Sequence, residues 1–234
     1  MALPLYLAQT PWEMTGNLPD FSAYMACHFS SGGQSLSNLP KNLPPGAMLI
    51  LDDSMPMDDH DPLQILAQLT DLLTQQDCES LLLDFQRPQI PAQQELAKLL
   101  CDTLPCPVGV TELYAGDLPC PVFLPPAPPD MPLSDYLAPW KGRDIWLEAA
   151  LDGMEFTLTE RGCTATPLPD FPESGFPEEK LHCHYRIQRI PETAIFQIWR
   201  TPEDLRALLS EAEGLGVSRA IGLWQELRMQ KPGL

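Results

Sequence analysis

The chain has 234 residues and carries 32 Asp and Glu against 14 Lys and Arg, a formal net charge of −18. Nucleic acids and anionic membrane surfaces are bound through clustered Lys and Arg, so this balance argues against both as partners. The 27 prolines are well above the usual share of about 5%.

The N-terminus and the cysteines predict a cytoplasmic chain. The first 14 residues contain Pro4 and Pro11 and have no basic region, so they lack the layout of a secretory signal peptide. No apolar run approaches the roughly 20 residues that a membrane-spanning helix needs. The seven cysteines are scattered without a CxxC pair, which predicts reduced thiols.

Short apolar runs recur along the chain, and most of them are continuous rather than alternating. Such runs are typical of parallel strands, which are buried on both faces. The runs are Pro4–Ala8, Tyr24–Phe29, Ala47–Leu51, Ser80–Phe85, Pro107–Thr111, Pro121–Leu124, Asp144–Ala149 and Ala220–Trp224.

Three amphipathic helices are predicted between some of these strands. They span Asp61–Gln76, Pro91–Leu104 and Thr201–Leu215, and the first begins with Asp61 as N-cap and Pro62 at the first helical position. Alternating strands and helices predict an α/β fold, here a (β/α)8 TIM-barrel-like architecture. The links 30–46 and 113–120 are too short or too rich in proline for full helices, so some helices are reduced.

Residues 152–198 break the alternation. They contain three strand-like runs, MEFTLTERG, LHCHYRIQ and AIFQIW, and the proline-rich stretch PLPDFPESGFPEEK, which reads as a loop. We interpret 152–198 as a small antiparallel insertion before the last βα unit, and 1–234 as a single TIM-barrel-like domain.

Functional side chains of such a barrel lie where its strands end. Polar side chains there are Asp52, Asp53, Asp84, Gln86, Glu112, Glu148 and Glu226, with His28 at the end of the second run. Two carboxylates that face each other across the barrel mouth can act as acid and base. Asp84, Glu112 and Glu148 are therefore the candidate catalytic residues.

Two segments resemble the family 18 glycoside hydrolases, the chitinase-like barrels, and especially their bacterial spore-cortex type. The fourth strand of that family reads D-x-x-D-x-D-x-E, and Glu79–Gln86 stands in its place. Ile195–Leu227 follows the layout of the family's final unit, with Trp224 at the position of its sugar-stacking tryptophan. The family often places a small α+β insertion where 152–198 lies.

The departures from the family pattern affect its chemistry. Gln86 occupies the place of the catalytic Glu, and an amide has no carboxylic proton to donate. Of the aspartates in the motif only Asp84 is kept, and Leu124-Pro125-Pro126 replaces the Tyr-Asp pair that holds the acetamido group. The resemblance therefore implies a barrel that binds a carbohydrate through Asp84, Gln86 and Trp224 without standard chitinase activity.

Aromatic residues and histidines complete the candidates. Trp224 could share a platform for sugar rings with Tyr114 and Tyr6, whereas Trp146 is expected in the core. We interpret His182 and His184 as exposed histidines on a strand. The acidic cluster at Asp58–Asp61, which includes His60, is interpreted as the solvated start of a helix. No metal or other cofactor is therefore predicted. Further candidate ligand-binding residues are Asp52, His28 and Glu226.

Three alternatives stay open at this point. The chain could be a divergent glycosidase that uses Glu112, Glu148 or Glu226, or a barrel hydrolase whose acids bind a metal. It could also be a non-catalytic scaffold that binds a protein partner through its acidic surface. The sequence does not determine the oligomeric state.

Overall fold

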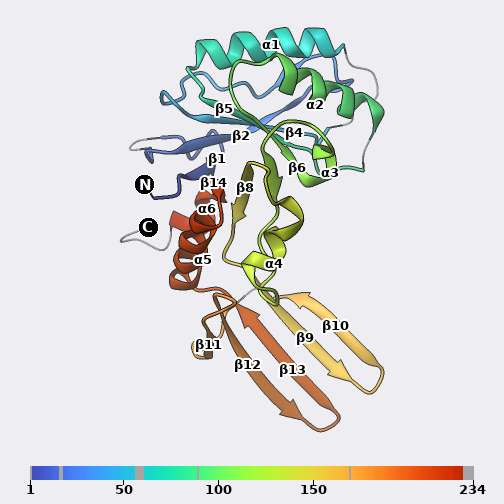
Figure 1. Ribbon diagram of the computed structural model, residues 1–234, viewed down its shortest axis with the longest axis vertical. Helices are drawn as coiled ribbons and strands as arrows, with labels where there is room; N and C mark the ends of the chain where they lie inside the picture. Colours follow the sequence, from blue (N-terminus) through green and yellow to red (C-terminus); the bar gives the residue numbers. More distant parts are fainter. Residues whose placement is uncertain (1, 16–17, 56–60, 89, 169, 229–234) are drawn as a thin grey trace.

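Eight parallel strands form a closed barrel, the upper part of the molecule in Figure 1. A computed structural model describes residues 2–15, 18–55, 61–88, 90–168 and 170–228. The strands follow chain order, and β1 pairs with both β14 and β2, which closes the barrel. They are β1 Leu5–Gln9, β2 Ser22–Phe29, β4 Met48–Asp52, β5 Ser80–Asp84, β6 Val108–Thr111, β7 Val122–Leu124, β8 Ile145–Ala149 and β14 Val217–Leu223. The predicted (β/α)8 fold is confirmed.

The helical layer is incomplete, as predicted. The full helices are α1 Pro62–Gln75, α2 Pro91–Thr103 and α5 Pro202–Gly214, and the side chain of Asp61 caps α1. In the described part of the links on either side of β2 there is no helix, only the two-residue strand β3, Leu36–Ser37. The short elements elsewhere are α3 Glu112–Ala115, α4 Leu133–Leu137, η1 Ala138–Trp140 and α6 Trp224–Leu227.

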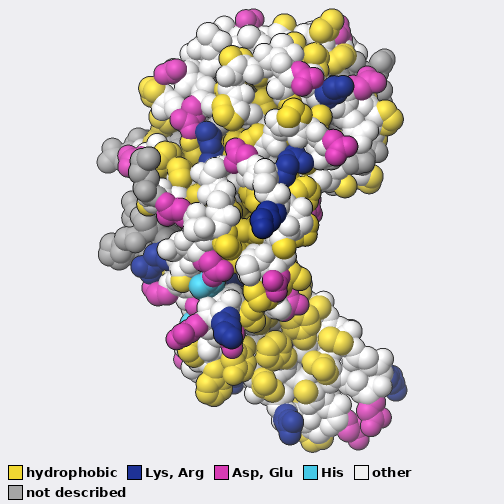
Figure 2. All heavy atoms as spheres, viewed as in Figure 1, with side chains coloured by type: hydrophobic (Ala, Val, Ile, Leu, Met, Phe, Trp, Pro, Cys, Tyr) yellow, Lys and Arg dark blue, Asp and Glu magenta, His cyan; other side chains and the backbone are white. Residues whose placement is uncertain are grey.

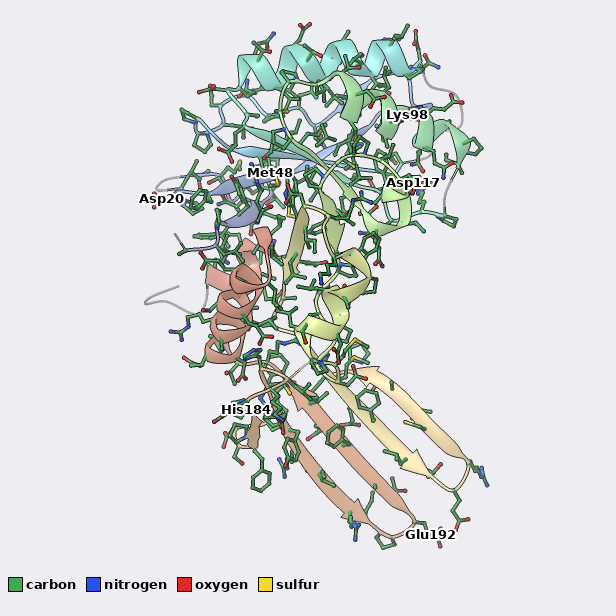
Figure 3. The ribbon with its side chains drawn as sticks, in the orientation of Figure 1. Asp20, Met48, Lys98, Asp117, His184 and Glu192 are labelled. Atoms are coloured by element: carbon green, nitrogen blue, oxygen red, sulfur yellow. The ribbon has the colours of Figure 1, made fainter. Side chains whose placement is uncertain are left out.

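Large side chains fill the inside of the barrel. Trp146 on β8 is fully buried among inward residues of the other strands, including Met48, which Figure 3 labels within the strands. Gly109 on β6 makes room for it, because a Cβ at that position would overlap the indole ring. The expectation that Trp146 belongs to the core is confirmed, and the barrel is a packed core rather than a pore.

The N-terminal end of the barrel is closed by a polar network around Arg219. Its guanidinium lies over the rings of Tyr6 and Trp146, 5.3 and 4.8 Å from their centroids. It donates to Ser80 Oγ at 2.7 Å and pairs with Glu79 at 3.3 Å, and the Tyr6 hydroxyl donates to the same carboxylate. Tyr6 therefore lies at the opposite end from the mouth, which corrects its predicted place in a sugar platform.

Residues 153–199 form a separate five-stranded antiparallel sheet that projects from the barrel (Figure 1). The order is β10-β9-β13-β12-β11. The strands are β9 Gly153–Thr159, β10 Gly162–Pro167, β11 Phe176–Glu178, β12 Cys183–Ile190 and β13 Thr193–Trp199. The antiparallel insertion is confirmed, but its described residues contain no helix, so the expected α+β character is wrong.

The insertion has one apolar and one polar face. Cross-strand pairing sets Phe156 opposite Phe196, and Tyr185 opposite Phe176. Their rings form a continuous row across four strands, with centroids 5.8 to 6.2 Å apart. Hydrophobic side chains gather over this part of the molecule in Figure 2. Most polar residues of β9 and β13, such as Glu155, Thr157 and Gln197, alternate with these and lie on the opposite face.

The start of α5 offers a test of local stability. Thr201 accepts from the backbone N–H of Asp204 at 3.2 Å, and the Asp204 carboxylate accepts from the Thr201 N–H at 2.8 Å. Removing this capping box in Thr201→Ala is expected to lower the free energy of unfolding by about 1 kcal/mol.

Urea denaturation measures this change, and Thr70→Ala is the matched control. Thr70 lies inside α1, where its hydroxyl only donates back to the carbonyl of Leu66. Its replacement is expected to be neutral or slightly stabilising. Equal losses for the two variants would contradict the role of the cap.

Candidate functional site

Acidic side chains meet at the C-terminal mouth of the barrel. Along β4 and β5 the inward residues Ile50 and Leu82 are each followed two positions later by an aspartate, Asp52 and Asp84, which are paired in register. Glu148 of β8 is two residues beyond the inward Trp146. These three carboxylates line one cavity of about 180 Å³ above the apolar core.

A second cavity of about 220 Å³ adjoins the first. Both are lined by Gln86, Phe123 and Glu148, so these side chains stand between the two spaces. Glu112 lines the second cavity from the start of α3 and is exposed. The sequence-predicted residues Asp52, Asp84, Gln86, Glu112 and Glu148 are thus brought together at the mouth.

Gln86 is held in place from two sides. Its side-chain amide donates to Asp84 Oδ1 at 2.5 Å. Its backbone N–H and that of Arg87 each donate to the carboxylate of Asp53 at 3.0 Å. Asp53 is 3% exposed and also accepts from Gln93 at 3.2 Å. Asp53 therefore fixes the loop that carries Gln86, while its neighbour Asp52 faces the cavity.

Burial and the charges of neighbouring acids favour the protonated forms of Glu148 and Asp84. Burial, followed by the charges of Asp84, Glu226 and Asp152, raises the pKa of Glu148 from 4.5 to about 7. The pKa of Asp84 is also raised, by burial and then by Asp52 and Asp53, although the hydrogen bond from Gln86 opposes this. The site therefore pairs a carboxyl group that titrates near neutrality with a second carboxyl on the facing side of the same cavity.

Comparisons with known proteins identify the fold. No family model matches the sequence, and no curated protein matches it either. Among solved structures, the chitinase of Chromobacterium violaceum ATCC 12472 matches at 9% identity, 94% coverage of this chain, 93% of that one and a TM-score of 0.60. The chitinase-like agglutinin RobpsCRA of Robinia pseudoacacia matches with a TM-score of 0.61 at 9% identity. The match covers 97% of this chain and 95% of that one. The Bacillus cereus spore cortex-lytic enzyme SleL matches with a TM-score of 0.55 at 9% identity. The match covers 94% of this chain and 70% of that one.

The chain has the fold of the family 18 glycoside hydrolases. At these identities the likeness concerns the fold alone, and it agrees with the resemblance that the sequence motifs indicated. In this family 18 fold β5 is the fourth barrel strand, so Asp84 and Gln86 stand at the strand end that the resemblance singled out.

Three further predicted ligand residues lie near the mouth without lining either cavity. Trp224 is partly exposed at the first position of α6. Glu226 accepts a hydrogen bond from the backbone N–H of Leu151, and burial and the charge of Asp152 raise its pKa. His28 is in register with Asp52, and its Nε2 lies 3.0 Å from the side-chain amide of Asn38.

Tyr114 is a correction to the predicted site. It is buried in the cluster between β5 and α2, and its hydroxyl donates to Gln93. Its ring meets Phe85 edge-on, with the centroids 5.5 Å apart. The short helix α3 turns this side chain outward from the barrel, so Tyr114 stabilises the wall and does not reach the mouth.

The histidines of the insertion are engaged with α5. His182 contacts Glu211 at 2.5 Å and His184 contacts Asp204 at 2.7 Å, each through one ring nitrogen. Figure 3 labels His184 where the insertion meets the barrel and Glu192 at its far end. His60 and its acidic neighbours 58–59 lie outside the described residues. Within the described ranges, no three His, Cys, Asp or Glu side chains are arranged to hold a metal ion.

Sequence reasoning missed the apolar residues that shape the mouth. Met25, Phe123 and Leu223 line the first cavity beside the carboxylates. The inward alternation along β7 and β14 was the available signal, since Phe123 and Ile221 share the barrel interior.

Among the described helices, none is long and apolar enough to cross a bilayer.

Proposed function

We propose that the chain binds a carbohydrate at the barrel mouth and does not cleave chitin by the acid-catalysed mechanism of family 18. Two lines of support are independent. The fold is that of structures named as a chitinase and as a chitinase-like agglutinin. The mouth combines carboxylates, which accept hydrogen bonds from sugar hydroxyls, with the apolar faces of Phe123 and Leu223.

The observation that carries the second half of this proposal is the hydrogen bond from Gln86 to Asp84. At the position of the family's acid, the amide is fixed as a donor to the neighbouring carboxylate. It has no carboxylic proton to transfer to a leaving oxygen. The same hydrogen bond leaves the Gln86 amide oxygen and the other oxygen of Asp84 available to a ligand.

The size of the site favours a short ligand. The two cavities measure about 180 and 220 Å³, each below the roughly 300–1,000 Å³ of a typical small-molecule site. We therefore assign to the mouth the end of a glycan chain or a small glycan fragment.

Calorimetry with chitotetraose tests the binding. We expect Asp84→Asn to weaken binding about tenfold, or about 1.4 kcal/mol, because a carboxylate is the stronger hydrogen-bond acceptor. Asp117→Asn makes the same substitution at an exposed position outside both cavities and should leave the affinity unchanged. Release of reducing ends from chitotetraose, or equal affinities for wild type and Asp84→Asn, would contradict the proposal.

Glu148 supports a second candidate function, divergent glycoside hydrolysis. Its raised pKa and its position in both cavities suit a general acid that donates its proton to the glycosidic oxygen. Asp84 would act as the facing carboxylate, either taking a proton from water or attacking the sugar. Water supplies the hydroxyl of the released sugar in either case.

Aryl glycosides separate the two candidates. The divergent hydrolase predicts slow release of the phenol that falls by at least about a hundredfold in Glu148→Gln, within the usual range for a general acid. Glu112→Gln, at the exposed edge of the second cavity, is the matched control. No release by the wild type would leave carbohydrate binding as the function.

A further inference from the structure

A cavity larger than either mouth cavity lies on the outer wall of the barrel. It measures about 690 Å³ and shares no lining residue with the two mouth cavities. We call it the outer-wall groove. It is formed by Thr10, Pro11, Trp12 and Met14 after β1, Tyr24 and Ala26 of β2, and residues 38–43.

The groove exists because the barrel lacks helices here. The described links on either side of β2 have no helix, and the outward residues Tyr24, which is itself buried, and Ala26 form the floor of a groove. Its shape is preset by hydrogen bonds. The Tyr24 hydroxyl donates to the carbonyl of Asn38 at 2.6 Å, and the side chain of Gln76, the C-cap of α1, accepts from the Leu43 N–H at 3.1 Å.

Trp12 lines this groove with 88% of its surface exposed, the highest fraction among the large hydrophobic side chains that the structure describes. The turn that carries it is ordered by the Glu13 carboxylate, which accepts from the N–H and the hydroxyl of Thr10, both at 2.9 Å. An exposed indole on a hydrogen-bonded turn loses little conformational freedom when a ligand covers it.

The polar lining differs in charge from the mouth. The groove is lined by the amides of Asn38 and Asn42, the hydroxyl of Thr10 and the ammonium of Lys41, with no carboxylate among its lining residues. The two mouth cavities are lined by Asp52, Asp84, Glu112 and Glu148. Lys41 is the one charged side chain among these lining residues, and the Glu13 carboxylate, which is bound to Thr10, is not one of them.

We propose that the outer-wall groove is a second carbohydrate site, separate from the mouth, in which a pyranose ring stacks on Trp12 and its hydroxyls bind Asn38, Asn42 and Lys41. The flat indole matches the C–H face of a pyranose, and amides both donate to and accept from hydroxyl groups. A volume of about 690 Å³ lies within the range of small-ligand sites and holds several linked sugar rings. Only the choice of sugar probes rests on the function proposed for the mouth.

Fluorine NMR of the full chain labelled with fluorotryptophan tests the site. The five tryptophans give five resonances, and Trp12→Phe identifies that of Trp12 by its loss. Adding millimolar chitotetraose or cellotetraose is expected to shift the Trp12 resonance. Asn42→Ala, an exposed change in the groove, should weaken this response several-fold.

Asp84→Asn is the control for the mouth. It should leave the Trp12 titration unchanged, because the groove and the mouth share no residue. The two proposals can fail separately. If only the function proposed for the mouth is wrong, Asp84→Asn leaves the calorimetric affinity unchanged, while the sugars still shift the Trp12 resonance. The groove proposal is overturned if neither tetrasaccharide moves the Trp12 resonance. It is equally overturned if a proline-rich peptide shifts that resonance and the sugars do not.

Discussion

Replacing Trp146 by alanine is expected to lower the free energy of unfolding by about 3–5 kcal/mol. The indole is fully buried at the centre of the barrel, where Arg219 lies over its ring and Gly109 leaves the space that it fills. The substitution removes this apolar volume and leaves a cavity, because strands on all sides prevent the barrel from collapsing inward. Urea denaturation followed by circular dichroism measures the loss.

Trp12→Ala is the matched control, since the same atoms are removed from a side chain that is 88% exposed. Its effect on the free energy of unfolding is expected to stay within about 0.5 kcal/mol. Similar losses for the two variants would show that the barrel interior is not the packed core described above. Trp146→Phe should fall between them, because the smaller ring still occupies most of the space.

Glu148→Gln is expected to stabilise the fold above neutral pH and to have little effect in acid. The folded protein holds the Glu148 proton up to about pH 7, whereas the unfolded chain releases it near pH 4.5. Between these values the folded state binds more protons, so the stability of the wild type falls as pH rises. Glutamine removes this dependence and is expected to gain about 2 kcal/mol above pH 7, allowing for the partial exposure of the side chain.

The measurement is the difference in unfolding free energy between Glu148→Gln and wild type at pH 4, 6 and 8. Below pH 4.5 both states of the wild type are protonated, and the difference should vanish. Glu160→Gln removes the same formal charge at the exposed turn between β9 and β10 and controls for net charge. A gain that is equal at all three pH values would contradict the raised pKa of Glu148.

The barrel strands were predictable because both of their faces are buried. Runs such as Met48–Leu51 and Leu81–Leu83 have no polar side chain between their ends, which only a covered parallel sheet accommodates. The strands β10 and β11 escaped prediction for the opposite reason. All residues of β10 are exposed, and β11 has only three residues with Pro177 at its centre, so neither has a hydrophobic pattern.

The candidate site was predictable as far as it depends on strands. The alternation of β4, β5 and β8 fixes Asp52, Asp84 and Glu148 on the inner side, and no other fold information is needed. Tyr114 and Trp224 belong to one-turn helices whose rotation the sequence does not determine. The outer-wall groove arises from helices that are absent, and most of its residues come from two links that carry no shared motif. The cytoplasmic location and the single-domain organisation stay predictions.

The antiparallel sheet leaves and rejoins the barrel at neighbouring points. Gly153, its first strand residue, pairs with Trp199, its last, and the Arg200 N–H donates to the carbonyl of Asp152 at 3.0 Å. Asp152 and Arg200, which flank the sheet in the connection between β8 and α5, therefore lie next to each other. The detour of the chain through the sheet therefore leaves the order of the barrel strands unchanged.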